Sequence, residues 1–543
     1  MKKKTWIFLT VILSLLSVIL LYACNPTTDE PGDTDNGPQS STTECPHEWV
    51  KKSSTAPNCI SHGRTTYTCL LCSQSKIEED DIYGQHNYIK HICTICGARE
   101  NGLKTYKSGN VTGYLYNAGS AFSDTVTYSI VFDGAGAMAD YNKPQDAPWY
   151  ENIASIVSIE FTDKVTHIGD YAFSGYSQVT EVSFGNGIES IGAYALRGLN
   201  LISEINLGSK LKSIGEYAFA DCSGLNRITL SKTTDSIQPF AFYGCRFLEE
   251  ITLGVPHSSG TGVCDKYFGS IFGYTDTDME NCTQFVTENG VDYGFYVPQY
   301  LTDVKVLCDN EVPDKVFYKC LNIVAIRFEG SITTIGERAF YGMEKLEKVE
   351  FAKDTVAEIK SYAFADCVSL GKDKEPDVPD MPPIKQDMVL SSQLTTLGTS
   401  VFFGCRSLQT VIFTDNAVTE IPMGTFENCT ALTKIELPES LKYINARAFY
   451  ACSSLAELKI PKNVLSLGTD AFGSCTCLNT LYIDSESVVN IINDNSKVFL
   501  KAIYIYLDGM NKTAVSTGSY IYKNFMYARK NETDNYHLWK KVS

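Results

Sequence analysis

The sequence predicts an α/β-type repeat solenoid in which each coil carries one short β-strand and the strands stack into a parallel sheet, with a small N-terminal Cys/His module before it. Three observations support this fold class. A turn motif of the form I-G-x-x-A-F-x-x-C recurs through most of the 543-residue chain. A short alternating apolar pattern follows the turns. Six of the 19 cysteines and four of the seven histidines are instead grouped between residues 45 and 97.

The repeat is defined by a large apolar residue in the turn, which we call the anchor. Successive anchors are 23 or 24 residues apart, except for two steps of 75 and 38 residues that we assign to insertions. An Ile or Leu stands five residues before ten of the anchors. Fixed offsets over so many copies indicate a solenoid, in which each repeat contacts only its neighbours. The anchors are Phe173, Leu196, Phe219, Phe242, Phe317, Phe340, Phe364, Phe402, Phe426, Phe449 and Phe472.

A strand is expected after each turn, where the pattern L-x-x-I-x-L recurs, as at 225–230 and 432–437. Its last three positions alternate, which predicts a short strand with one buried face. One strand per coil, stacked about 4.8 Å apart, forms a parallel sheet. A single coil cannot bury its apolar face alone. We therefore expect one solenoid over residues 156–500, with insertions at 254–300 and 371–391, rather than the several domains that chain length suggests.

Eight cysteines share one position in the repeat, three residues after an anchor. In other coils this position holds Tyr176, Leu199 or Met343. Exchange with large apolar residues predicts a ladder of buried free thiols that act as small core residues. Whether Cys264 and Cys282 pair with each other stays open. The eight residues of the ladder are Cys222, Cys245, Cys320, Cys367, Cys405, Cys429, Cys452 and Cys475.

The N-terminus is typical of a bacterial export signal. Three lysines at 2–4 precede an almost uncharged apolar run over 6–23, and a single transmembrane anchor is the alternative interpretation. The run ends in Leu21-Tyr22-Ala23-Cys24, which resembles a lipobox and implies a lipid on Cys24. Residues 1–23 would then be a lipoprotein signal peptide and residues 24–44, rich in Asp, Pro, Gly, Ser and Thr, a flexible tether. Either anchor places the chain outside the cytoplasmic membrane, at the bacterial cell surface.

Residues 45–100 carry metal-ligand residue types. Two C-x-x-C pairs, Cys69/Cys72 and Cys93/Cys96, are separated by 20 residues, which fits the zinc-ribbon pattern. A segment this small needs a staple. Disulfides are the alternative in an exported chain, but the neighbouring histidines favour structural zinc. We find no general base that would indicate a catalytic metal. Additional ligand candidates are His47, Cys59 and His86.

The repeats resemble the BspA-like leucine-rich repeat family. The segment IGEYAFADCSGLNRITL at 214–230 and its copies carry the resemblance, which covers roughly residues 103–543. Residues 101–155, with Gly134–Met138 and Trp149, are similar to the N-terminal cap of the family, and residues 501–543 would be the C-terminal cap. The Cys/His segment is similar to zinc-ribbon-type modules that precede leucine-rich repeats in some bacterial surface proteins. The resemblance implies a surface-displayed binding scaffold, since members with assigned roles are mostly adhesins.

The sequence does not identify ligand-binding residues. The outward strand positions mix charges and include one aromatic residue, Tyr482, so this face either contacts a protein or is only solvated. The two insertions are better candidates, because loops on a rigid scaffold tend to carry function. With 46 basic against 63 acidic residues and a net charge of −17, the chain lacks the basic balance of a nucleic-acid-binding protein.

Catalysis is not indicated. The sequence has no G-x-S-x-G elbow, Walker loop or H-E-x-x-H motif. Outside the Cys/His module, no histidine stands near a Ser or Cys in a setting that suggests activation. We therefore expect no catalytic residue and predict a lipid-anchored surface scaffold or adhesin for an extracellular protein or cell-surface ligand. The alternatives are a structural cell-envelope protein without a specific ligand and, less favoured, a glycan-processing enzyme with two carboxylates.

Overall fold

The structure is a computed structural model with two compact units, Met1–Glu100 and Asn101–Ser543. It describes residues 46–55, 62–83, 88–89, 92–93, 102–118, 126–373, 386–414, 417–483, 504–508, 525–530 and 536–541. The predicted signal peptide, Cys24 and the tether lie outside these residues. Within the described part of the chain, no helix is long and apolar enough to span a membrane.

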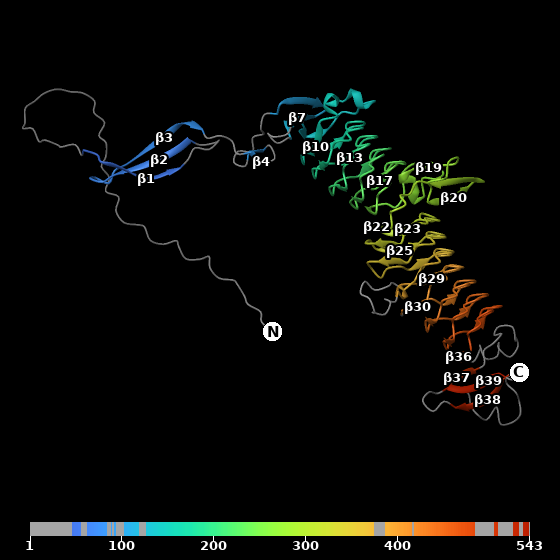
Figure 1. Cartoon of the computed structure of the whole chain (residues 1–543). Helices are drawn as coiled ribbons and strands as arrows, with labels where there is room; N and C mark the ends of the chain where they lie inside the picture. The colour runs from blue at the N-terminus through green and yellow to red at the C-terminus, as the bar shows by residue number, and fades with distance from the viewer. Residues whose placement is uncertain are drawn as a thin grey trace, which may run out of the picture. The chain divides into compact units, whose positions relative to one another are not determined.

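The N-terminal unit contains a three-stranded antiparallel sheet of order β1-β2-β3 (Figure 1). Its strands are β1 (Trp49–Thr55), β2 (His62–Cys69) and β3 (Ser75–Tyr83). Two short strands, β4 (Tyr88–Ile89) and β5 (Ile92–Cys93), form a separate hairpin. Pairing of Trp49 with Cys69 brings the start of β1 beside the end of β2. Among the described residues of this unit, Cys69 is the only buried hydrophobic residue, so the described side chains of the sheet form almost no core.

The second unit begins with a hairpin that covers the first coil. Strands β6 (Lys104–Ser108), β7 (Val111–Asn117) and β8 (Tyr128–Asp133) pair antiparallel, and β8 then pairs parallel with β10 (Ile156–Phe161). In the sequence, Trp149 stands between the 3₁₀ helices η1 (Pro144–Asp146) and η2 (Tyr150–Asn152). Its indole is fully buried. Its Nε1 donates a hydrogen bond to the carbonyl of Ala172 at 2.9 Å. The hairpin therefore closes the end of the solenoid, which would otherwise expose apolar core.

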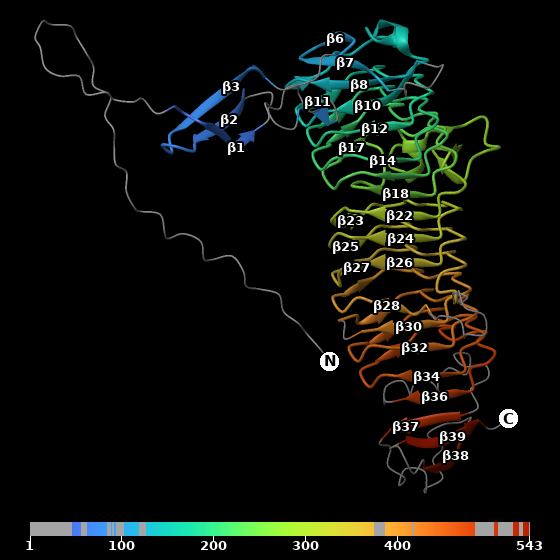
Figure 2. The same cartoon turned by 60° about the vertical axis from the view of Figure 1, so that its left-hand side comes forward.

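Two stacks of parallel strands run along the solenoid, and their successive rungs are seen in Figure 2. The first stack follows the turns and contains β10, β12 (Glu181–Ser183), β14 (Glu204–Asn206), β16 (Arg227–Thr229), β18 (Glu250–Leu253), β22 (Asp303–Val306), β24 (Ala325–Phe328), β26 (Lys348–Phe351), β28 (Met388–Leu390), β30 (Thr410–Phe413), β32 (Lys434–Glu436), β34 (Glu457–Ile460) and β36 (Thr480–Ile483). The second stack precedes the turns and contains β9 (Gly136–Ala137), β11 (Val165–Ile168), β13 (Ser190–Ile191), β15 (Ser213–Ile214), β17 (Ser236–Ile237), β23 (Asn310–Val312), β25 (Ile332–Ile335), β27 (Glu358–Ile359), β29 (Thr396–Leu397), β31 (Glu420–Ile421), β33 (Tyr443–Ile444) and β35 (Ser466–Leu467). The predicted repeat solenoid is confirmed. The described residues contain three short 3₁₀ helices and no α-helix.

The turns form a third column between the two stacks. At every one of the eleven predicted anchors, the residue two before and the residue two after have positive φ, as Tyr217 (54°) and Asp221 (57°) do around Phe219. The intervening backbone projects the anchor ring into the core, where anchors of neighbouring coils stack. Phe402 and Phe426, for example, lie with ring centroids 5.4 Å apart and planes 4° from parallel. The N–H of Phe402 also donates to the carbonyl of Thr425 at 2.8 Å.

The predicted cysteine ladder is confirmed as a row of buried free thiols. Most of the thiols donate to the carbonyl of the anchor one coil earlier, as Cys452 Sγ does to Phe426 at 3.1 Å. Burial raises the pKa of the Cys222 thiol to about 12. These cysteines are therefore core residues, with neither the exposure nor the thiolate character of a nucleophile.

Part of the predicted insertion at 254–300 is itself a coil. The 3₁₀ helix η3 (Phe268–Phe272) occupies a place in the turn column, since Phe240 N–H donates to Ser270 (3.0 Å) and Phe268 N–H donates to Val316 (2.7 Å). After η3, the strands β19 (Tyr274–Thr275), β20 (Gln284–Glu288) and β21 (Val291–Phe295) form a small antiparallel sheet of their own. Strand β22 then pairs with β18 and β24. Cys264 and Cys282 are both buried free thiols, so they do not pair.

The last described strands extend the first stack beyond β36. Strand β37 (Tyr504–Asp508) pairs parallel with β36, and β39 (Tyr536–Lys541) pairs antiparallel with both β37 and β38 (Phe525–Lys530). The direction of pairing thus changes from parallel to antiparallel at this end, as it does at the N-terminal hairpin.

Candidate binding site

The outward face of the first stack carries charges that neutralise each other between coils. Arg227 Nε lies 2.9 Å from the carboxylate of Glu250 in the next coil, and Arg327 Nε lies 2.8 Å from the carboxylate of Glu350, also in the next coil. Exposed pairs of this kind contribute little stability, but they leave few unpaired charges for a partner. The solvated interpretation of this face is therefore favoured over a contact surface.

The first stack is interrupted between β26 and β28. Strand β26 ends a six-stranded sheet and pairs only with β24, whereas β28 begins a new sheet and pairs only with β30. The other two columns continue across this point. Strand β27 pairs with β29, and the N–H of Phe364 donates to the carbonyl of Val401 at 2.9 Å. The two coils are therefore joined along two columns and separate along the third.

The interruption of the first stack follows from the number of residues between the turn and the next strand. In the other coils with an anchor, the strand of the first stack begins eight residues after it, as Arg227 follows Phe219. After Phe364 the next strand among the described residues begins at Met388. Gly371 (φ 74°) makes the first bond of the missing strand, from its N–H to the carbonyl of Glu347 at 3.1 Å. The described chain then stops at residue 373 and resumes at 386, so the centre of the predicted insertion at 371–391 lies outside the described residues.

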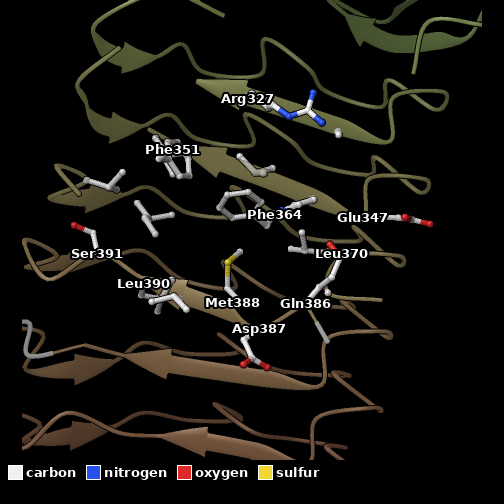
Figure 3. A pocket seen from close by; sticks show the side chains of 18 of the residues that line it. Arg327, Glu347, Phe351, Phe364, Leu370, Gln386, Asp387, Met388, Leu390 and Ser391 are labelled. Carbon is white, nitrogen blue, oxygen red and sulfur yellow. The ribbon is translucent and has the colours of Figure 1, made fainter. Parts of the chain in front are cut away.

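The interruption holds a cavity of about 760 Å³. The first stack also lacks pairing between β12 and β14 and between β32 and β34, but the break at β26 and β28 is the one that opens into this cavity. Figure 3 shows the side chains of Phe364 and of Met388, which begins β28, among those that line the cavity. Its apolar wall is formed by Val349, Phe351, Val356, Phe364, Leu370, Met388 and Leu390.

Polar side chains line the cavity as well. Glu347, Gln386 and Asp387 are among them, and neither of these two carboxylates forms a salt bridge with a described residue. The Oε1 atom of Gln386 is buried and has no hydrogen-bonding partner among the described residues. A buried polar atom without a partner costs about 1–3 kcal/mol, so a donor group from a ligand would be stabilised here.

The predicted metal ligands are distributed unevenly. The structure brings together His47, Cys69 and Cys72, whose ligand atoms all lie within 4.8 Å of one another. Cys93 ends β5, and its side chain is not described; Cys59, His86 and Cys96 lie outside the described residues. Burial raises the pKa of the Cys69 thiol, but hydrogen bonds from His47 and from the backbone of Leu71 and Cys72 outweigh it and lower the value to about 6.

One histidine outside the Cys/His module does lie beside a serine. His167 Nδ1 is 2.7 Å from Ser190 Oγ, and its Nε2 is 3.0 Å from Asp140. The order resembles a Ser-His-Asp triad, but the Asp140 side chain is 63% exposed, whereas the carboxylate of a triad is buried to hold the imidazole. Ser190 also occupies the same register as Ser213 and Ser236 along the second stack. The three groups therefore form part of a polar row between coils.

These features define a parallel β-solenoid repeat protein with capped ends and an interrupted strand stack. The family model for the BspA type leucine rich repeat region matches in six copies over residues 147–265, 310–376 and 384–501. Together these cover more than half of the chain, which therefore belongs to this family.

Several solved structures are similar. A leucine-rich repeat protein from Bacteroides ovatus is 17% identical over 72% of this chain and 98% of its own, with a TM-score of 0.34. One from Eubacterium ventriosum is 19% identical over 69% and 95%, with a TM-score of 0.24. A leucine rich cell surface protein from Faecalibacterium prausnitzii is 18% identical over 61% and 94%, with a TM-score of 0.22. No curated protein matches the chain.

Proposed function

We propose that this chain is a lipid-anchored scaffold of the bacterial cell surface that acts as an adhesin, binding an extracellular protein or cell-surface ligand. The lipobox-like Leu21–Cys24 segment supports the anchor, and membership of the BspA-type family supports the repeat scaffold. The observation that carries the binding function is the cavity at the break between β26 and β28, because it combines apolar surface with unpaired backbone.

The shape of the break favours an extended polypeptide as the ligand. Among the described residues, the edges of β26 and β28 that face the break carry backbone N–H and C=O groups without strand partners. Such edges accept a further strand, whose alternate side chains enter pockets beside it. A cavity of about 760 Å³ has room for large apolar side chains, since ligand pockets are about 300–1,000 Å³. The proposed ligand is therefore a protein segment in extended conformation with large apolar residues.

Charge adds a second element of selectivity. Glu347 and Asp387 both line the cavity and have no salt-bridge partners among the described residues. A Lys or Arg that follows the apolar residues of the ligand would be attracted to them. Such rim charges mainly raise the association rate and the specificity of binding. The ligand is thus expected to bind more weakly as ionic strength rises.

The proposal can be tested with the ectodomain, residues 25–543. A random peptide display library is selected on the immobilised protein, and a recovered peptide is measured by fluorescence polarisation. Met388→Lys places a charge in the cavity and should weaken binding at least tenfold. Met423→Lys is the matched control, because Met423 is 50% exposed on a different coil. Equal affinities for the two variants would place the peptide elsewhere and contradict this site.

The two alternatives predict different results. A structural envelope role predicts envelope defects when the protein is deleted and no peptide or protein selected by the ectodomain. A glycan-processing enzyme predicts turnover of a glycan library by the same ectodomain. Recovery of a saturable ligand that requires the cavity, without turnover, supports the binding function over both.

A further inference from the structure

The turn between β2 and β3 has the geometry of a metal-binding knuckle. The N–H of Ser73 donates to the carbonyl of Cys69 at 3.0 Å, and the N–H of Cys69 donates to the carbonyl of Gln74 at 2.8 Å. Ser73 has a φ of 60°. The N–H of Leu71 also points at Cys69 Sγ, at 3.4 Å. The tight turn thus holds the Sγ atoms of Cys69 and Cys72 on one side, and a backbone N–H already faces the first of them.

The neighbouring strand brings a third donor to the same place. The N–H of Leu70 donates to the carbonyl of Glu48 at 3.0 Å, which fixes the residue next to His47 against the turn. His47 Nδ1 then lies 3.3 Å from Cys72 Sγ. Zn–S bonds of about 2.3 Å and Zn–N bonds of about 2.0–2.1 Å in a tetrahedron separate neighbouring donors by roughly 3.5–3.8 Å. The spacing within the cluster is compatible with that arrangement.

The N-terminal unit also needs a stabilising element that its described side chains do not supply. Leu70 and Leu71, in the same turn, are 65% and 59% exposed, and Cys69 is the only buried hydrophobic residue among those described in the unit. A sheet of this size without a core is not expected to be stable alone. Binding of a metal to folded ligands contributes directly to the free energy of folding.

We propose that His47, Cys69 and Cys72 bind a structural Zn²⁺ that fastens β1 to the turn between β2 and β3. One nitrogen and two sulfur donors suit zinc, whereas Ca²⁺ and Mg²⁺ prefer oxygen. Structural zinc sites have four ligands, of which these residues supply three. The inference is independent of the proposed binding function, because the metal site lies in the N-terminal unit and the cavity in the solenoid.

The test measures metal content in the full-length chain. The protein is extracted in detergent, purified under reducing conditions without chelator, and its zinc is counted by mass spectrometry. About one zinc per chain is expected, since structural sites bind zinc tightly. Cys72→Ser and His47→Ala should each lower the content several-fold. Cys477→Ser is the matched control, because Cys477 is an exposed free thiol of the solenoid and its loss should leave the zinc bound.

A second readout does not depend on stability. Replacement of zinc by Co²⁺ should give thiolate-to-cobalt charge-transfer absorption in the near ultraviolet, which Cys72→Ser weakens and Cys477→Ser leaves unchanged. Unchanged zinc in Cys72→Ser, or no bound zinc in the unmodified chain purified under reducing conditions with zinc supplied, would overturn the proposal.

Discussion

At the scale of single residues, the turn column depends on positions with left-handed backbone. Glycine fills many of these positions, but Lys319 and Ala451 occupy them too, with φ of 51° and 60°. A residue with a Cβ pays about 1–2 kcal/mol for this conformation, and burial of the neighbouring anchor offsets the cost. The repeat therefore tolerates varied residues at the turn while it retains one backbone path.

Exchanges between glycine and alanine at these positions should have opposite effects. Gly198→Ala adds a Cβ that would make only ordinary contact, 3.6 Å from Gly175, so its cost is conformational, about 1 kcal/mol in the free energy of unfolding. Ala451→Gly relieves that strain and should stabilise by about 0.5 kcal/mol after the entropy of glycine is included. Urea denaturation of both variants provides the measurement. Shifts of the same sign would show that the turn is not limited by backbone strain.

The buried thiols predict a loss of stability in alkali. Burial raises the pKa of Cys222 to about 12, whereas an unfolded cysteine titrates near 8.5. Between these two values the unfolded chain releases a proton that the folded chain keeps. The free energy of unfolding should therefore fall by about 1.4 kcal/mol per pH unit for each such thiol as pH rises, with no effect below about pH 8.

Cys222→Ala should remove one of these contributions. The variant will be less stable at neutral pH, because it loses packing, but its stability should fall less steeply between pH 9 and 11. Leu199→Ala is the matched control, since Leu199 occupies the same buried position in the preceding coil and does not titrate. The measurement is the urea midpoint of each variant and of the unmodified chain across this pH range, from which the pH dependence of stability is compared. If both variants kept the slope of the unmodified chain, the thiols would not be its source.

At the scale of strands, the break between β26 and β28 follows from one departure in spacing. Elsewhere eight residues carry the chain from an anchor to the next strand of the first stack, which is enough to place each strand against the previous one. After Phe364 the longer connection lets β28 pair with β30 but not with β26. Because the turn column and the second stack are intact there, the gap is local and leaves the rest of the fold in register.

Restoring the spacing should close the gap. Deletion of residues 372–387 puts Met388 eight residues after Phe364, where it can continue the chain from Gly371 along β26. Backbone amides of 348–351 and 388–390 that face the gap should then exchange with deuterium at least tenfold more slowly, because they gain strand partners. Replacement of 374–385 by a Gly/Ser segment of equal length is the control and should leave exchange fast. Fast exchange in the deletion variant would mean that spacing does not cause the break.

At the scale of the whole molecule, the features that can be predicted from the sequence are those that repeat with the coil, namely the turns and the strands. The anchors locate the turns, and a constant offset then places nearly every strand. The coil on Phe268–Phe272 lacks the turn motif, so the spacing of the repeat does not locate it; the family resemblance of the 254–300 insertion indicates a coil there, and the hydrogen bonds to Phe240 and Val316 place it. The approach of His47 to Cys72 depends on strand pairing over 25 residues, and the cavity depends on pairing that fails to form. Neither leaves a local pattern.

The interrupted stack also weakens the coupling between the two halves of the solenoid. Repeat proteins are stabilised by contacts between neighbouring coils, and at the break those contacts reduce to the second stack and the turn column. The rings of Phe364 and Phe402 lie 5.4 Å apart across it. This stacked pair should therefore carry a larger share of the coupling between the two halves than any ring pair beside a continuous sheet.

Removal of the ring of Phe402 should uncouple the halves. Phe402→Ala is expected to cost about 3–5 kcal/mol and to split urea unfolding into two transitions, with amides after residue 386 losing protection first. Phe219→Ala deletes an equally buried ring where β14, β16 and β18 pair continuously, so a similar loss should leave one transition. Hydrogen exchange during urea titration resolves the two outcomes. A single transition in both variants would show that the second stack and the backbone of the turn column are enough to make the solenoid unfold as one unit.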